Sequence, residues 1–157
     1  ICIDATIVFV FSIKEAIKTG KRDNIYNLAI QKAKTDIVKN LLQDALIQPY
    51  PVNINGRWFN PDSEYQGYFG FAFQNAFYHI LNGENFYKSM VETMAMGGDT
   101  DTNGCIAGSL LGAYYGIEYI PKKWIYRIIN AKFNYNRLEK YPDVNTKDII
   151  RLVNSII

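Results

Sequence analysis

The residues of this sequence best suited to chemistry lie together in the stretch GGDTDTNGCIAG, at positions 97–108. Asp99 and Asp101 supply two carboxylates, and their polar neighbours supply hydroxyl and amide oxygens: Thr100, Thr102 and Asn103. Two adjacent carboxylates repel each other unless a proton or a cation lies between them. Such hard oxygen ligands select a hard cation such as Mg²⁺, Ca²⁺ or Mn²⁺. The alternative is that an aspartate here only caps a following helix, because its oxygen can accept from free backbone N–H groups.

One familiar calcium pattern can be excluded. The letters DTDTNG, beginning at Asp99, match the first half of the EF-hand loop. That loop requires a bidentate glutamate at its twelfth position, and counting from Asp99 places Leu110 there. A glycine pair also stands where the entering helix of an EF-hand would end. The acidic stretch is therefore not an EF-hand.

Helices must position this stretch, because apolar residues recur every three or four positions through most of the chain. Such stripes run over residues 7–17 and 28–42, and again over 68–81 and 85–94. Gly20 is expected to end the first of these helices. Residues 48–66 break the pattern, since they are rich in proline, asparagine and glycine, and they predict a long loop.

The glycines that follow the acidic stretch are spaced four residues apart, at Gly104, Gly108, Gly112 and Gly116. Each interior glycine costs a helix about 1 kcal/mol relative to alanine. We therefore expect this helix at the centre of the domain, with its glycines on one side against a neighbouring backbone. Pro121 is expected in the first turn of the next helix, and Asn145 or Thr146 at the start of a last one. No alternating strand pattern is evident, so the predicted fold class is all-α.

Composition and charge fit a single globular domain. The 157 residues are 48% hydrophobic and 20% charged, and the formal net charge is +2. The early basic residues are interrupted by acidic ones, which favours a solvated helical face over a nucleic-acid patch. Cys2 and Cys105 lack the spacing of a zinc site or a disulfide framework, which favours a reducing, cytoplasmic setting. The apolar runs are too short to span a membrane, and we expect no membrane partner. Since the sequence begins at Ile1, we expect it to be a piece of a larger protein.

Several segments, taken in order and spacing, resemble one known family. They are CIDATIVFVFSIKEAIKTGK near the start, GYFGFAFQNAFYHIL, MGGDTDTNGCIAGSLLGAYYG and IPKKW. Together they are similar to the C-terminal half of the ADP-ribosylglycohydrolase family, which includes the dinitrogenase-reductase-activating glycohydrolases. The resemblance covers the chain up to about Trp124, and the GGDTDT signature with its glycine helix is the specific part. Residues 1–157 are accordingly expected to be the C-terminal part of a single domain whose N-terminal half is absent.

The resemblance implies an all-helical domain with two adjacent divalent cations, Mg²⁺ or Mn²⁺. Such a domain hydrolyses the glycosidic bond between ADP-ribose and a modified protein or nucleotide-derived acceptor. The family's metal ligands fall on Asp99, Asp101 and Thr102. Tyr68 falls where an aromatic ring lies against the bound ADP-ribose, and a core tyrosine is the alternative. Gly97 and Gly98 are expected to let the backbone approach the ligand.

The sequence also departs from the family pattern. The family's Thr-Asp-Asp cluster, which completes the metal site, does not occur here, and Thr35-Asp36 is a poor substitute within an amphipathic helix. The acidic catalytic residue is expected in the missing N-terminal half. His79 has no counterpart role in the family and is expected to be a packed or surface residue.

Three interpretations follow from the match and the departures. In the first, the chain is a fragment or a split-gene half of an ADP-ribosylglycohydrolase and is active only with its missing N-terminal half, which in the split-gene case is a separate partner chain. In the second, it is a degenerate relative that binds ADP-ribose or serves as a structural or interaction module. In the third, it is an unrelated helical protein with a capped glycine helix.

Overall fold

A computed structural model of the chain describes residues 1–131 and residue 151. Its helices, in chain order, are α1 (Cys2–Thr19), α2 (Arg22–Lys32), α3 (Asp36–Asp44), α4 (Phe69–Asn82), α5 (Phe86–Ala95), α6 (Thr100–Tyr115) and α7 (Lys122–Ile129), with a 3-10 turn η1 (Ile117–Tyr119) ahead of α7. Two short strands, β1 (Val52–Ile54) and β2 (Arg57–Phe59), lie between α3 and α4. The predicted all-α class is confirmed. Among the described residues, no helix has the length and apolar character needed to cross a membrane.

The chain divides into two compact units. Residues 1–119 form the first unit, which holds the acidic stretch, and residues 120–157 form the second. Within the second unit, Pro121 occupies the N-cap position of α7, close to the first-turn position expected from the sequence. The proposed caps of a last helix, Asn145 and Thr146, lie outside the described residues.

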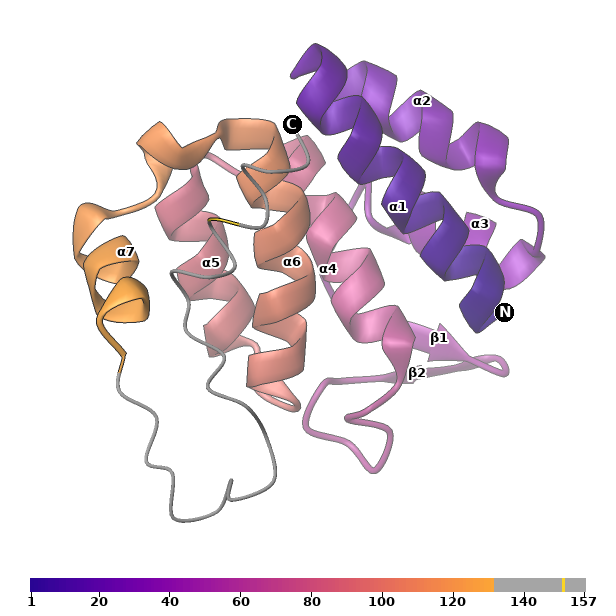
Figure 1. Cartoon of the computed structure of the whole chain (residues 1–157). Helices are drawn as coiled ribbons and strands as arrows, with labels where there is room; N and C mark the ends of the chain where they lie inside the picture. Colours follow the sequence, from indigo (N-terminus) through magenta and orange to yellow (C-terminus); the bar gives the residue numbers. More distant parts are fainter. Residues whose placement is uncertain (132–150, 152–157) are drawn as a thin grey trace. The chain divides into compact units, whose positions relative to one another are not determined.

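Helix α4 forms the centre of the first unit (Figure 1). It packs against α6 most extensively and also contacts α1, α2 and α3. Every residue from Gly70 to Phe77 is buried, and Phe71 and Phe77 are completely enclosed. The expected helix over residues 68–81 is therefore confirmed. Because neighbours cover more than one of its sides, its buried surface is wider than a single apolar stripe.

Two charged side chains hold α2 and the start of α3 in place. The buried carboxylate of Asp4 accepts the backbone N–H and the hydroxyl of Thr35, both at 2.7 Å. At the other end of α2, the Arg22 guanidinium donates to the Gly83 carbonyl at 2.8 Å and to the Tyr114 hydroxyl at 3.0 Å. These bonds join the first three helices to the end of α4 and to α6. Gly20 ends α1 in the left-handed conformation with φ 56°, as expected.

The long loop expected over residues 48–66 is only partly correct. Its middle forms an antiparallel hairpin in which Val52 pairs with Phe59 and Ile54 pairs with Arg57. The turn residues Asn55 and Gly56 have φ values of 51° and 84°, as a two-residue hairpin turn requires. Asn-Gly between two apolar runs is a strong hairpin signal, so the sequence contained the information.

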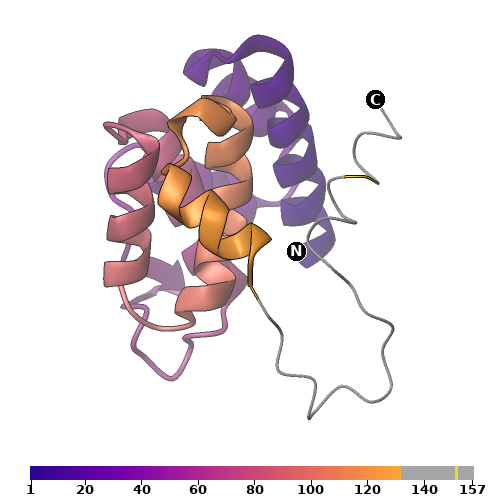
Figure 2. The same cartoon turned by 60° about the vertical axis from the view of Figure 1, so that its left-hand side comes forward.

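Helix α6 lies against α4, α5 and α1 (Figure 2), which confirms its predicted central position. A Cβ atom on Gly108 would lie 3.3 Å from the Met90 methyl, and one on Gly104 would overlap the Met94 methyl. The small residues thus admit methionines of α5, not the backbone of another helix. The expectation of one continuous glycine face is wrong at Gly112, where nothing lies within 4 Å of the Cβ position.

Candidate functional site

The two aspartates of the acidic stretch lie at the first turn of α6. Asp99 occupies the N-cap position and is partly exposed, whereas Asp101 and Thr102 are exposed in the first turn. Interaction with the Asp99 side chain lowers the pKa of Asp101 below its usual value, and the backbone N–H groups of Thr102 and Asp101 contribute to the same effect. The two carboxylates are neighbours, because Asp101 follows Asp99 by two positions at the start of the helix. This is the proximity in which carboxylates share a proton or a cation.

The capping alternative fails at Asp99. Its side chain makes no capping hydrogen bond, although its backbone carbonyl accepts the Asn103 N–H at 2.9 Å. The carboxylate of Asp101 accepts the N–H of the adjacent Thr102 at 2.9 Å. An N-cap aspartate usually accepts from the second or third N–H of its helix. The side chain of Asp99 thus lies at the helix N-terminus without serving as its cap.

A neighbouring loop supports the backbone just before the pair. Gly97 and Gly98 have φ values of 80° and 68°, a conformation that favours glycine. The Gly98 N–H donates to the Asp62 carboxylate at 2.8 Å. A Cβ on Gly98 would lie 2.5 Å from the Pro61 carbonyl oxygen, and one on Gly97 would overlap the Asp62 carboxylate. In this structure the glycines therefore give close approach to Pro61 and Asp62. Sequence reasoning missed this contact, which joins residues 36 positions apart.

Tyr68 lies at the N-cap position of α4, and α4 and α6 both begin at the lower end of Figure 1. Its ring is half-buried, lies over Gly70 and meets the Phe69 ring at a centroid distance of 4.7 Å. Burial raises the pKa of its hydroxyl. The side chain lines a cavity of about 220 Å³ between α3 and the hairpin, with Asn40, Asp44 and Asn53. Tyr68 is therefore not a fully buried core residue.

The residues present fit one side of a metal site. Asp99, Asp101 and Thr102 offer only oxygen ligands, which suit Mg²⁺ or Mn²⁺. Within residues 1–131 and 151, no group of three or more histidine, cysteine, aspartate or glutamate side chains is placed to hold a metal ion. Thr35 does not supply a second cluster, because its hydroxyl donates to Asp4 at the junction of α2 and α3.

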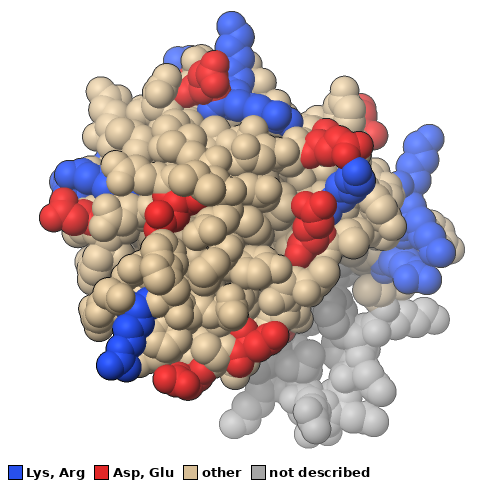
Figure 3. Space-filling model, turned by 180° about the vertical axis from the view of Figure 1, so that it is seen from behind, with Lys and Arg blue, Asp and Glu red and all other residues tan. Residues whose placement is uncertain are grey.

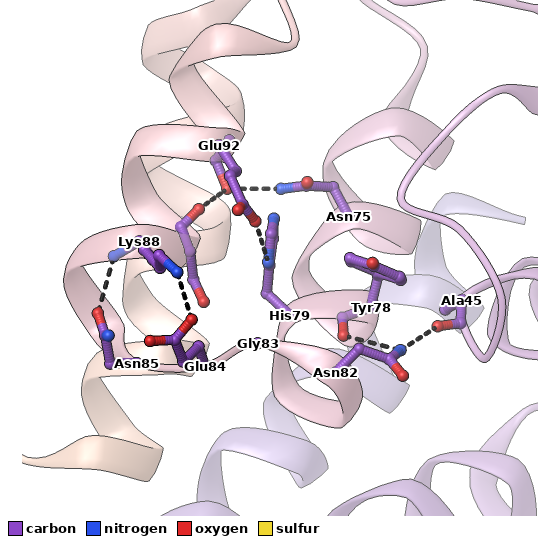
Figure 4. Close-up of polar contacts among 12 residues, drawn as sticks. Ala45, Asn75, Tyr78, His79, Asn82, Gly83, Glu84, Asn85, Lys88 and Glu92 are labelled. Atoms are coloured by element: carbon purple, nitrogen blue, oxygen red, sulfur yellow. Dashed lines mark hydrogen bonds and ion pairs between the residues drawn. The ribbon is translucent and has the colours of Figure 1, made fainter.

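A separate polar cluster lies between α4 and α5 (Figure 4). His79 is 1% exposed, and its Nδ1 is 3.7 Å from the Glu92 carboxylate. Burial lowers the pKa of His79 to about 4. Nearby, the Asn75 amide donates to the Thr93 hydroxyl at 2.9 Å. His79 is thus a packed residue, as expected, whereas no periodic pattern predicts its polar neighbours.

Charged side chains do not form a binding stripe on the face shown in Figure 3. On that face, acidic and basic side chains of the described residues are interspersed over a largely uncharged surface. This distribution agrees with the expected solvated surface. No dense basic stripe of the kind that binds duplex nucleic acid is visible on this one face.

Comparison with known proteins adds independent information. The sequence model of one family, described as ADP-ribosylglycohydrolase, matches residues 1–154. An ADP-ribosyl glycohydrolase of Acanthamoeba polyphaga mimivirus is 35% identical over 86 residues, which are 55% of this chain and 26% of the relative. The ADP-ribosyl-dinitrogen reductase glycohydrolase of Rhodospirillum rubrum is 34% identical over 55 residues, or 35% of this chain and 19% of that protein.

A third relative is matched over more of the chain. The ADP-ribosylarginine hydrolase of Pseudomonas putida is 27% identical over 112 residues, which are 66% of this chain and 30% of that protein. The matched part therefore spans less than a third of each of these three relatives. No solved structure is significantly similar to the chain.

Proposed function

Because the chain belongs to the ADP-ribosylglycohydrolase family, we propose that it carries one side of the binuclear metal site of a hydrolase. The reaction removes ADP-ribose from modified protein or from related ADP-ribosyl conjugates. The observation that carries this proposal is the Asp99–Asp101 pair. Asp99 and Asp101 lie two positions apart at the start of α6, their side chains interact, and the Asp99 side chain does not cap its helix.

Each residue has a defined role in the proposed site. The carboxylates of Asp99 and Asp101 and the hydroxyl of Thr102 hold one side of a pair of Mg²⁺ or Mn²⁺ ions. When bound, such a pair orients ribose hydroxyls and supplies an activated water. Tyr68 packs its half-buried ring against ADP-ribose. Gly97 and Gly98 set the path of the backbone into the acidic turn, the first turn of α6 that carries Asp99 and Asp101. Their left-handed backbone lets Pro61 and Asp62 pack directly against it.

The remaining ligands and the catalytic acid come from outside this sequence. Two observations support this part of the proposal: the described residues offer no third acidic ligand beside the pair, and the mimivirus match covers only 26% of that relative. An N-terminal half of the domain, in the same polypeptide or as a separate cytoplasmic chain, would complete the site. The alternative function, ADP-ribose binding without turnover, is favoured only by that missing third ligand.

Metal binding tests the proposed site. We expect Mg²⁺ or Mn²⁺ to raise the melting temperature of a complete protein that contains both halves of the domain, since a cation relieves the repulsion between Asp99 and Asp101. A ligand at about a hundred times its Kd stabilises a protein by about 2.7 kcal/mol. Asp101→Ala should abolish the shift. Asp36→Ala, which removes a carboxylate that is 94% exposed on α3, should leave it unchanged. Equal melting temperatures in metal and in chelator would refute the metal site.

A further inference from the structure

A second cavity lies beside strand β2 and the loop that follows it. Its volume is about 450 Å³, within the range of about 300–1,000 Å³ typical of small-ligand sites. Its polar and aromatic lining comes from the hairpin and from the loop after it: Asn55, Arg57, Trp58, Phe59, Glu64 and Tyr65. None of these residues belongs to the proposed metal and ADP-ribose site.

Two aromatic side chains of this cavity are open to solvent. Trp58 is 53% exposed and Tyr65 is 41% exposed. The Phe59 ring supports Tyr65 from its edge, at a centroid distance of 4.6 Å. Exposed tryptophan and tyrosine rings held in a concave site are suited to stacking on a flat ligand. We therefore expect the cavity to bind a ligand that contains a planar ring.

The charged side chains of the cavity can bind two further chemical groups, a phosphate and ribose hydroxyls. Among the ion pairs of the described residues, none involves Arg57, so its exposed guanidinium is available for a phosphate. Glu64 lies in the same lining without pairing with Arg57. A carboxylate in such a place accepts hydrogen bonds from the hydroxyls of a ribose. The amide of Asn55 can bond the edge of a base.

The loop that lines this cavity is hydrogen-bonded to the backbone just before Asp99. Asp62, which accepts the Gly98 N–H at 2.8 Å, comes two residues before Glu64 in the same loop. The cavity that contains Tyr68 shares only Ile54 and Asn55 with this one. The hairpin therefore contributes to two distinct cavities. The loop after β2 connects the second of them to the turn that carries Asp99.

We propose that this cavity is a nucleotide-binding site. The rings of Trp58 and Tyr65 stack on the base, Glu64 binds the ribose, and Arg57 binds the phosphate. The inference does not depend on the proposed function, because no residue of the metal and ADP-ribose site lines the cavity. The same chemistry occurs in a free mononucleotide, in a nucleotide of a single strand and in an additional ADP-ribose unit.

Trp58 provides a direct test. In a Trp124→Phe chain, Trp58 is the remaining tryptophan, because the sequence has only two. Titration with AMP should quench its fluorescence saturably, and adenosine or ribose 5-phosphate should bind at least tenfold more weakly. Arg57→Gln and Tyr65→Ala should each weaken AMP at least tenfold. Tyr65→Phe, which keeps the ring, and Arg127→Gln, which removes another exposed arginine, should bind as the parent does.

Three further measurements serve as controls. Asp99→Asn and the addition of chelator should leave AMP binding unchanged. The metal site and the nucleotide-binding site are therefore tested separately. An oligodeoxyadenylate and ADP-ribose are titrated in parallel with AMP. The ligand that quenches Trp58 at the lowest concentration shows whether the site prefers a single strand, ADP-ribose or a free mononucleotide. Circular dichroism confirms that each variant is folded. Absence of quenching, AMP binding that survives in folded Arg57→Gln, or its loss in Asp99→Asn would overturn the proposal.

Discussion

At the scale of single residues, His79 shows how burial sets the protonation state of a side chain. The ring is 1% exposed between α4 and α5, and burial lowers its pKa to about 4 from a reference value of 6.5. The Glu92 carboxylate lies 3.7 Å from Nδ1 but is itself 61% exposed, so water screens its effect. The folded protein therefore keeps His79 neutral at neutral pH.

Stability should consequently fall on acidification. Between about pH 6.5 and pH 4 the unfolded chain binds a proton at His79 that the folded chain does not, so the free energy of unfolding decreases as the pH falls. The slope for one group approaches about 1.4 kcal/mol per pH unit. Because the chain has a single histidine, urea unfolding between pH 7 and pH 5 isolates its contribution. His79→Phe should flatten the profile in that window, and an equally steep profile in this variant would contradict the assignment.

At the scale of elements, the glycines of α6 have different surroundings. Gly108 faces Met90, and a Cβ there would lie 3.3 Å from the methionine methyl, whereas Gly112 has open space beside it. Gly112→Ala should therefore stabilise the protein by up to about 1 kcal/mol, since alanine is the better helix former. Gly108→Leu should destabilise it by about 1–3 kcal/mol through overpacking against α5. Denaturation midpoints measure both, and equal effects of the two substitutions would show that the contact with Met90 is unimportant.

The helices were predictable because their signals are local. The stripes over residues 68–81 and 85–94 correspond to α4 and α5, and Gly20 ends α1 as expected. The hairpin was missed because proline and asparagine on both sides outweighed the Asn-Gly signal at its turn. The hydrogen bond between Gly98 and Asp62 and the one between Arg22 and Gly83 join residues that are far apart in the sequence. Periodicity along one helix contains no information about such partners.

At the scale of the whole molecule, apolar side chains of α1 are exposed to solvent. Ile3 and Val10 on α1 are 79% and 58% exposed. An apolar cavity of about 230 Å³, lined by Phe9, Phe69 and Ile106 among others, opens between α1, α4 and α6. Ile106 follows Thr102 by one turn of α6, so this cavity lies close to the acidic turn. If the proposed N-terminal half completes the metal site, we expect it to cover these apolar side chains as well.

Release of ADP-ribose from arginine- or serine-modified protein, in the presence of Mg²⁺ or Mn²⁺, is the most direct measurement of the central claim. We expect no release by residues 1–157 alone, because displaced catalytic geometry costs about a hundredfold in rate and, on the proposed function, the other half of the metal ligands would be missing as well. Adding the N-terminal half of an ADP-ribosylglycohydrolase should restore release, and Asp99→Asn should abolish it. Robust metal-dependent release by residues 1–157 alone, lost in Asp99→Asn, would contradict the account, as would restored release that Asp99→Asn leaves unchanged.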